Sequence, residues 1–218
     1  MNNKYIKDST NKNLLIFFNG WGFDEKILPL LDIPNYDKLL LYKYSNFNIN
    51  NIKIEKEYKN ITVVAWSLGV WIAPIIVKKL NIKIDKAIAI NGTLNPIDDD
   101  FGIPKSVFEG TLTNLNERNL KKFNTRIAGG GRMFGEIEEY FGTGCWEERK
   151  DELQFLFDSI NINPKTENIF NHAIIANDDL IFSADNQKRH WQTEEDTVIT
   201  EIKGAHFPFN TINIGTLL

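Results

Sequence analysis

The segment from Val63 to Trp71, VVAWSLGVW, constrains the fold more than any other part of this chain. A β-branched run ends at Ser67, and an apolar stretch typical of a helix begins at Trp71. A strand, a sharp turn and a helix in this order predict a nucleophile elbow, which exposes the serine hydroxyl above the end of a sheet. Such a turn needs small residues two positions before and two after the serine, and Ala65 and Gly69 meet this need. Small residues also surround serine in ordinary turns, so the interpretation needs partner residues elsewhere.

A serine nucleophile needs a histidine as general base, and the chain contains three histidines. His172 opens the apolar run HAIIA and is expected at a strand end, whereas His190 is expected on a helix. His206 lies in the loop GAHFPF, which follows the run TVITEIKG near the C-terminus. The chain order of an α/β-hydrolase is serine, acid, histidine, which favours His206 as the base. The alternative is a loop histidine that packs against Phe207 and Phe209.

The acid of such a site should follow the strand that precedes the histidine loop. The run HAIIAND predicts this strand, which ends at Asp178 and Asp179. A carboxylate, one variable residue and an apolar anchor in DLIF favour Asp179, and Asp178 is the alternative. Either residue could instead form a strand-end turn or a helix cap. Asp98, Asp99 and Asp100 follow the run KAIAING and are less favoured, because three adjacent carboxylates are typical of a solvated loop.

Backbone N–H groups that bind an oxyanion are expected at two turns. The first strong strand, LLIFF, is followed by Asn19-Gly20-Trp21-Gly22, whose glycines permit a tight turn close to a ligand. The elbow aims the N–H of Leu68 at a developing oxyanion, and the N–H of Trp21 is its natural partner. A plain strand-to-helix turn is the alternative interpretation of the glycine segment.

Six segments together resemble the BioG-type pimeloyl-[acyl-carrier protein] methyl ester esterases, which are small α/β-hydrolases of biotin synthesis. The resemblance extends from Phe17 to Phe209 and rests on FFNGWGFD, VVAWSLGVW, INGTLNPID, FGIP, NDDLIF with the following DNQ and W, and GAHFPF. It implies a site made of Ser67 as nucleophile, Asp179 as acid, His206 as base, and the oxyanion N–H groups of Trp21 and Leu68.

The resemblance implies a hydrolase that removes the methyl group from pimeloyl-[acyl-carrier protein] methyl ester. It also implies an acyl carrier protein as the partner that bears the substrate. The segment GGGRMFGEIEEYFGTG matches the family least, and this segment should shape the acyl channel. A serine esterase or thioesterase for other short acyl substrates is therefore an alternative. A non-catalytic, carrier-binding protein with a relic hydrolase fold is another.

Alternating strand and helix patterns predict the rest of the fold. Such alternation favours a mostly parallel sheet flanked by helices, as in a single α/β-hydrolase domain over residues 1–218. Little precedes the first expected strand, so the leading antiparallel hairpin of larger hydrolases should be absent or vestigial. Strands are expected near residues 13–18, 37–43, 61–66, 85–91, 172–177 and 197–202, and helices near 24–31, 50–58, 68–80 and 184–191.

Residues 93–170 break the alternation and are expected to form a small helical cap, inserted before the strand that carries the acid. Within this segment, residues 147–160 have apolar positions at the spacing of an amphipathic helix. A long, thin and mostly apolar acyl chain needs an apolar wall. The candidates for this channel are Phe123, Met133, Phe134, Tyr140, Phe141 and Trp146.

A basic cluster in the same segment is a candidate surface for the acidic carrier protein. Arg118, Lys122 and Arg126 recur every four residues and should share one helix face, with Lys121 and Arg132 nearby. Complementary charge would steer the carrier toward this face. The alternative is an ordinary solvated helix face.

Composition limits the remaining function classes. The net charge of -4 gives no reason to expect a nucleic acid partner. A single cysteine, Cys145, excludes an internal disulfide and suits a reducing cytoplasm. The run LLIFF is too short for a membrane span or a signal-peptide core. With no metal or phosphate-binding motif in the sequence, we expect a cytoplasmic enzyme without metal or cofactor, whose oligomeric state the sequence leaves open.

Overall fold

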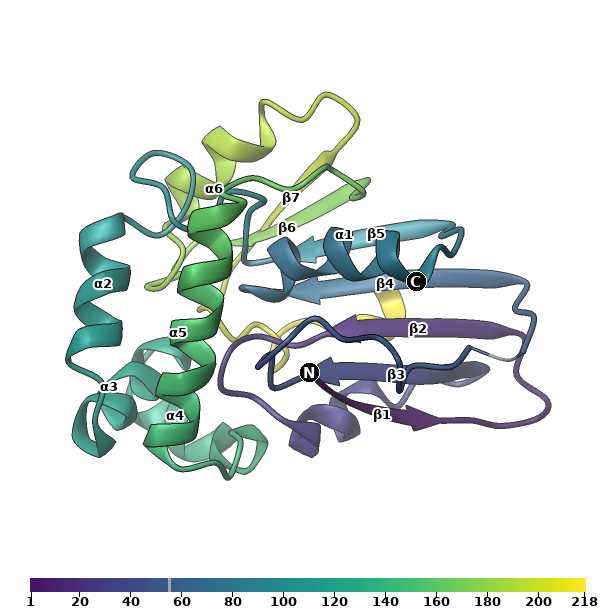
Figure 1. Cartoon of the computed structure of the whole chain (residues 1–218), viewed down its shortest axis with the longest axis horizontal. Helices are drawn as coiled ribbons and strands as arrows, with labels where there is room; N and C mark the ends of the chain where they lie inside the picture. Colours follow the sequence, from purple (N-terminus) through teal and green to yellow (C-terminus); the bar gives the residue numbers. More distant parts are fainter. Residues whose placement is uncertain (55) are drawn as a thin grey trace.

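A seven-stranded sheet forms the centre of the computed structural model, which describes residues 1–54 and 56–218 (Figure 1). The strand order is β1-β3-β2-β4-β5-β6-β7, and every pair is parallel except β1 with β3. The fold class predicted from the sequence is therefore confirmed. The strands are β1 (Asn2–Ile6), β2 (Asn13–Phe18), β3 (Tyr36–Tyr42), β4 (Asn60–Trp66), β5 (Lys86–Ile90), β6 (His172–Ala176) and β7 (Val198–Ile202).

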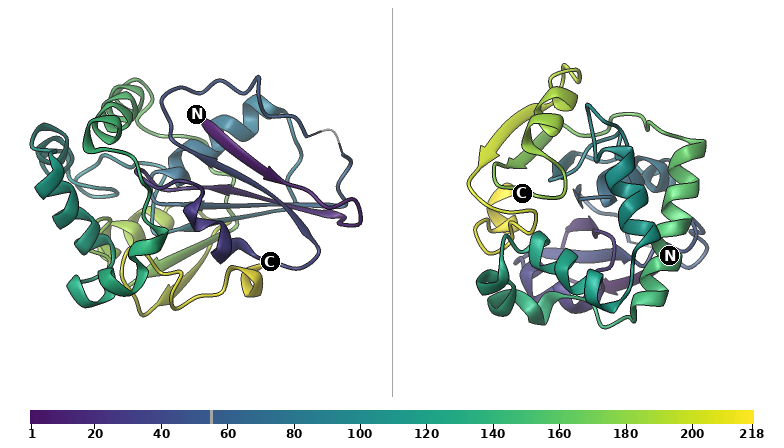
Figure 2. Two further views of the ribbon diagram at one scale, coloured as in Figure 1. Left: turned by 90° about the horizontal axis from the view of Figure 1, so that it is seen from below. Right: turned by 90° about the vertical axis from the view of Figure 1, so that its left-hand side faces the viewer.

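Helices cover both faces of the sheet and one of its ends. The helices α2 to α5 all belong to the connection between β5 and β6, and they stand beyond the carboxyl ends of the parallel strands (Figures 1 and 2). The α-helices are α1 (Gly69–Leu80), α2 (Lys105–Thr113), α3 (Glu117–Ile127), α4 (Gly131–Ile137), α5 (Trp146–Ile162) and α6 (Ala184–Trp191), and the 3-10 segments are η1 (Glu25–Leu31), η2 (Glu138–Tyr140) and η3 (Ile214–Leu217).

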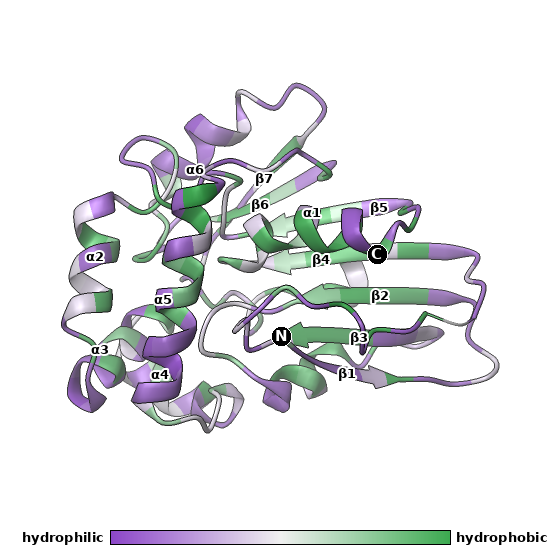
Figure 3. Ribbon diagram, in the orientation of Figure 1, coloured by the Kyte–Doolittle hydropathy of each residue, from purple (hydrophilic) through white to green (hydrophobic). Residues whose placement is uncertain are grey.

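Alternation along each central strand divides the buried side chains into two layers. On β2, Leu14, Ile16 and Phe18 belong to the layer that α1, α2, α5 and α6 cover. Leu15 and Phe17 belong to the opposite layer, which η1, η3, α3 and α4 cover. Because successive strand residues point to opposite faces, continuous apolar runs are required for a sheet buried on both sides. The central strands are accordingly mainly hydrophobic, whereas α3 and α6 are mainly hydrophilic (Figure 3).

Two expectations from the sequence are wrong. The described residues 50–54 and 56–58 form turns and extended chain instead of a helix, while residue 55 lies outside the described part. Just before them, Asn46 accepts from the N–H of Asn48, and Asn48 accepts from the N–H of Asn50. Such side-chain bonds to the backbone compete with helix formation.

The second error is a strand at the start of the chain that the expected strands do not include, although the leading hairpin of larger hydrolases is reduced as expected. The structure has one strand there, β1, which pairs antiparallel with β3 and therefore does not form a hairpin with β2. Its residues are half-buried or exposed, as expected at a sheet edge, so it lacks the apolar run that marks the central strands.

Asn91, directly after β5, joins three segments at the carboxyl edge of the sheet. Its side-chain oxygen accepts from the N–H of Ala176 at 2.8 Å. Its amide nitrogen donates to the carbonyl oxygens of Ala205 at 3.2 Å and His206 at 3.0 Å. The residue has a φ of 47°, in the left-handed region that asparagine tolerates better than most residues. Asn91 thus connects β5, β6 and the loop that carries His206.

We predict that Asn91→Ala destabilises the protein by about 2–4 kcal/mol, because it leaves several buried backbone groups without partners. Urea unfolding followed by circular dichroism measures this loss. Asn60→Ala is the matched control, since Asn60 is exposed and its side-chain amide donates to Asn13 Oδ1 at 2.8 Å, at the other end of the sheet. The control should change stability by less than about 0.5 kcal/mol. An equal loss in both variants would contradict the bracing role of Asn91.

Candidate active site

Ser67 occupies a strained turn between β4 and α1. It has a φ of 58°, and a non-glycine residue in this region costs about 1–3 kcal/mol. The helix begins so close to β2 that a Cβ on Gly69 would lie 2.5 Å from the carbonyl oxygen of Phe18. Ala65, two residues before Ser67, is fully buried, so its methyl group fits where a glycine is usual. The local structure has the strand, turn and helix of the expected elbow.

A chain of two hydrogen bonds joins Ser67, His206 and Asp179. Ser67 Oγ lies 2.8 Å from His206 Nε2, and His206 Nδ1 lies 2.8 Å from Asp179 Oδ2. All three residues are buried, with 7 %, 1 % and 7 % of their surface exposed. With the Nδ1 proton directed at the carboxylate, Nε2 is free to accept the serine proton. The arrangement is capable of nucleophilic acyl transfer.

The structure distinguishes the candidate acids. Asp179 is buried, and its Oδ1 accepts from the N–H groups of Ile181 at 2.8 Å and Phe182 at 3.0 Å. Asp178 is exposed, and His206 Nδ1 is paired with Asp179 instead. The acidic cluster at residues 98–100 has a structural role in its own loop. Side chains of the cluster accept from backbone N–H groups of that loop and of Lys105.

Gln187 on α6 is a site residue that the sequence analysis missed. Its amide nitrogen donates to Asp179 Oδ2 at 3.2 Å and to the carbonyl oxygen of Phe182 at 2.8 Å. It therefore holds the same carboxylate oxygen that faces His206. A glutamine inside a polar helix gives no local signal of this role. Only the packing of α6 beside β6 brings it to the acid.

Two aromatic side chains contact His206, one at its backbone and one at its ring. The indole N–H of Trp66 donates to the carbonyl oxygen of His206 at 2.8 Å. The ring of Phe182 stacks on the imidazole with an interplanar angle of 10° and a centroid distance of 6.0 Å. The other histidines have different places. His172 begins β6, and His190 accepts from the N–H of Leu94 at 3.2 Å. Burial lowers the pKa of His190 to about 4, so it is neutral at pH 7.

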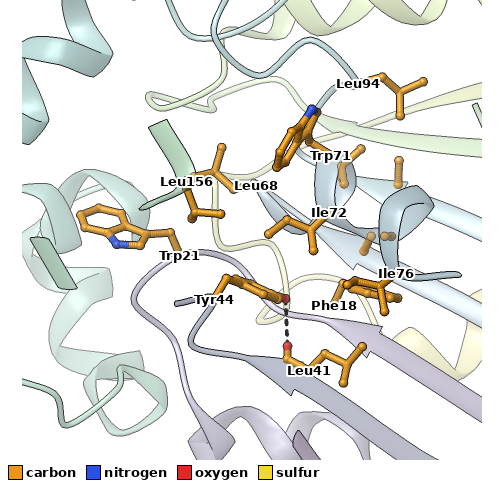
Figure 4. Packing of buried hydrophobic residues seen from close by; sticks show 14 of the residues in the cluster. Phe18, Trp21, Leu41, Tyr44, Leu68, Trp71, Ile72, Ile76, Leu94 and Leu156 are labelled. Atoms are coloured by element: carbon orange, nitrogen blue, oxygen red, sulfur yellow. Dashed lines mark hydrogen bonds between the residues drawn. The ribbon is translucent and has the colours of Figure 1, made fainter. Parts of the chain in front are cut away.

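The two expected oxyanion donors lie on either side of Ser67. Leu68 precedes α1, and Trp21 lies in the turn after β2. Within residues 1–54 and 56–218, neither backbone N–H has a protein acceptor. Both side chains belong to the apolar layer that also contains Leu156 of α5 (Figure 4). Both residues line the same cleft as Ser67.

An apolar cleft opens at Ser67 and has a volume of about 580 Å³, its open mouth included. Its walls come from the turn after β2, the elbow at Ser67, the helices α2, α3 and α5, and the segment after Asp179. The lining residues are Gly20, Trp21, Phe23, Trp66, Ser67, Leu68, Ile103, Val107, Phe108, Thr111, Phe123, Arg126, Ile127, Leu153, Leu180, Ile181 and His206.

The expected channel residues are mostly wrong. Of the six described side chains proposed for the channel, Phe123 alone lines the cleft. Four others pack in the opposite layer, where the Phe141 ring lies 4.7 Å from that of Phe23. Aromatic side chains of α4 and η2, and Phe141 after them, pack beside η1 and the histidine loop, as where Phe141 stacks on Phe207. Sequence spacing could not indicate on which side of the sheet they would pack. The residues placed away from the lining are Met133, Phe134, Tyr140 and Phe141 in that layer, and Trp146 at the start of α5.

The basic cluster lies partly at the mouth of the cleft. Arg118, Lys121, Lys122 and Arg126 are exposed on α3, and Arg126 also lines the cleft. A second hollow between α2 and α3 shares Val107, Thr111, Phe123 and Arg126 with the cleft and includes Lys122. Arg132 lies on α4, where its Nε pairs with Glu136 at 3.3 Å.

Among the described residues, no group of three or more His, Cys, Asp or Glu side chains is placed to bind a metal ion. A search of the same residues for a helix with the length and hydropathy of a membrane span found none.

Sheet order and elbow define the chain as an α/β-hydrolase. A lipase-esterase related protein of Clostridium acetobutylicum shares the fold, with a TM-score of 0.66 and 20 % identity over 99 % of this chain and 96 % of that one. A family model described as pimeloyl-ACP methyl esterase BioG matches residues 1–214, so the chain belongs to the BioG family of hydrolase-type enzymes.

Two relatives have higher identity. The crystal structure of BioG from Haemophilus influenzae is 33 % identical, with a TM-score of 0.89 and coverage of 98 % of this chain and 97 % of that one. A Bacteroides fragilis protein named malonyl-[acyl-carrier protein] O-methyltransferase is 39 % identical over 196 residues. That match covers 90 % of this chain but 40 % of the relative, so the chain spans less than half of that protein's length.

We predict that Asp179→Asn lowers hydrolysis of a small soluble ester by about 10⁴-fold, because an amide stabilises the wrong imidazole tautomer. Asp178→Asn is the matched control and should stay within about twofold of wild type, since surface changes away from a site are nearly neutral. Initial rates at saturating ester, with unfolding temperatures, measure both effects. Equal losses would remove Asp179 from its proposed role.

Proposed function

We propose that the chain is a serine esterase that hydrolyses the methyl ester of a pimeloyl group carried by an acyl carrier protein. The observation that carries the proposal is the hydrogen-bonded chain from Asp179 through His206 to Ser67, which ends at an apolar cleft. Membership of the BioG family supports the substrate class.

The proposed reaction proceeds through a seryl ester. His206 accepts the proton of Ser67 as the hydroxyl attacks the methyl ester carbonyl, and Asp179 stabilises the resulting imidazolium. The N–H groups of Trp21 and Leu68 bind the oxyanion. His206 then gives its proton to methanol as it leaves. Water attacks the seryl ester by the same steps, and the free pimeloyl carboxylate leaves on its carrier.

The chemistry in the name of the Bacteroides fragilis relative supports a methyl ester as substrate. That protein is named for methyl transfer to a carrier-bound acid, and this chain matches 40 % of its length. An esterase of the proposed kind removes the group that such a transfer installs. The methyl transfer would come at the start of a carrier-bound synthesis, and the proposed ester hydrolysis would come at its end.

We propose that residues 93–170 act as a cap that receives the carrier-bound chain. The hollow between α2 and α3 lies next to the cleft, because four side chains line both. It also contains polar groups suited to an amide-containing arm, namely Ser106, Asn114 and Asn119. The apolar cleft would hold the acyl chain, and the polar hollow would hold the arm that links it to the carrier.

We predict that Ser67→Ala lowers hydrolysis of pimeloyl-[acyl-carrier protein] methyl ester on the order of a million-fold, because the nucleophile is lost. Mass spectrometry of the carrier detects loss of the methyl group. Ser45→Ala serves as control, since Ser45 is an exposed serine outside the cleft. Near-normal hydrolysis by a folded Ser67→Ala protein would refute the proposal. A wild-type protein that cleaves carrier thioesters and leaves the methyl ester intact would refute its substrate.

We predict that Arg118→Glu with Lys122→Glu raises the KM for the carrier-linked ester roughly tenfold at low salt, because surface charges set the encounter rate. Both residues are exposed and lie outside the cleft at Ser67, so the KM for a small ester should not change. The control is Lys12→Glu with Lys59→Glu, an equal charge change beside the amino ends of β2 and β4. The difference between the pairs should shrink as salt rises. Equal changes in KM for the two pairs of substitutions would mean that the carrier protein binds at another surface.

A further inference from the structure

Glu152 on α5 is a buried carboxylate to which the proposed mechanism assigns no role. It has 6 % of its surface exposed and lies one position from Leu153, which lines the cleft. Its Oε1 accepts from the backbone N–H of Tyr44 at 2.7 Å. The backbone N–H of Gly22 also interacts with this carboxylate and lowers its pKa, and both residues line the same hollow. Gly22 directly follows Trp21, so this carboxylate reaches the turn that carries a proposed oxyanion donor.

The turn after β2 depends on bonds from other parts of the chain. Gly22 has a φ of 78°, a conformation that glycine adopts without strain but that gives the turn no stiffness of its own. At one end of the turn, the Tyr44 hydroxyl donates to the carbonyl oxygen of Asn19 at 2.9 Å. From α5, the carbonyl oxygen of Arg149 accepts from the indole N–H of Trp21 at 2.8 Å. Together with Glu152, these bonds hold the turn against α5.

We propose that Glu152 is a positioning residue for the oxyanion hole. By accepting from the Tyr44 N–H and interacting with the Gly22 N–H, it connects the residue that holds the Asn19 carbonyl oxygen to the peptide that follows Trp21, and so directs the Trp21 N–H into the cleft. The inference rests on the proposed function, because it assigns the Trp21 N–H to the oxyanion. An oxyanion donor must be held in place before the reaction, since its contribution depends on needing no reorganisation.

A stabilising role does not explain this carboxylate. Burial raises the pKa of Glu152 to about 7, so the anion that interacts with these N–H groups is itself unfavourable in this site. Protonation would occupy one oxygen and weaken the hold on the turn as the pH falls below about 7. The charged and titratable groups that face the carboxylate or share its hollow are Arg149, Lys43, Tyr44, the amino group of Met1, Asp24, Glu148 and Asp151.

The test compares Glu152→Gln with Asp151→Asn. Glutamine has the same shape, but it accepts with one oxygen and presents N–H groups to the other donor. We expect kcat for a small soluble ester to fall by about tenfold to hundredfold with KM unchanged, as for a misplaced donor. Affinity for a trifluoromethyl ketone, whose adduct with serine places an oxyanion in the hole, should fall by the same factor. Asp151 is exposed in the same hollow, so its variant should match wild type.

A second measurement does not depend on activity. The amide resonances of Gly22 and Tyr44 in the wild-type protein should shift together with an apparent pKa near 7, and Glu152→Gln should abolish that shift. This measurement applies even if Glu152→Gln does not fold. It also distinguishes the two proposals, because a protein without esterase activity would still show the titration. Unchanged kcat in folded Glu152→Gln, an equal fall in kcat for Asp151→Asn, or amides that do not titrate would each overturn the inference.

Discussion

The close contact between the start of α1 and the end of β2 determines where every other part of the site lies. A Cβ on Gly69 would lie 2.5 Å from the carbonyl oxygen of Phe18 and 2.7 Å from that of Asn19. A Cβ on Gly92 would lie 2.4 Å from the carbonyl oxygen of Ser67. The elbow therefore touches the oxyanion turn and the end of β5 through backbone atoms, with no side chain between them. Such contacts leave little freedom, so Ser67 and the two proposed oxyanion donors, Trp21 and Leu68, share one rigid frame.

Two helices that line the cleft are joined to this frame by hydrogen bonds to their carbonyl oxygens. The carbonyl oxygen of Ile127, at the end of α3, accepts from the N–H of Phe207 at 3.0 Å, one residue from His206. The carbonyl oxygen of Arg149 on α5 accepts from the indole of Trp21. Helix α3 thus contacts the histidine loop, and α5 contacts the oxyanion turn. A ligand that moves either helix would act on the reacting groups as well as on the acyl chain.

How far the sequence predicted the structure depended on whether a feature is local. The parallel strands were found within one or two residues, because each is a short apolar run bounded by polar residues. The spacing in DLIF favoured Asp179, and the structure places that carboxylate beside His206. The channel was mostly wrong, because aromatic composition does not say which side of the sheet a loop will cover. Gln187 and Glu152 were missed for a related reason, since a polar residue on a helix becomes buried only through tertiary packing.

Two buried titratable groups, Glu152 and His190, make the stability of the fold depend on pH in opposite directions. The folded pKa of Glu152, about 7, lies above the usual 4.5 of a glutamate, so its contribution to stability is fully present below pH 4.5 and is lost as the pH rises through about 7. His190 has the opposite sign, because its pKa falls from 6.5 to about 4, and its contribution is lost as the pH falls through that range. Between pH 4.5 and 6.5 the two slopes oppose each other. Above pH 6.5, Glu152 is the one of these two groups that still titrates. Its anion, which we propose holds the turn after β2, therefore forms in a pH range where its formation lowers the stability of the fold. A cost of this kind is expected of a group that serves a site rather than the core.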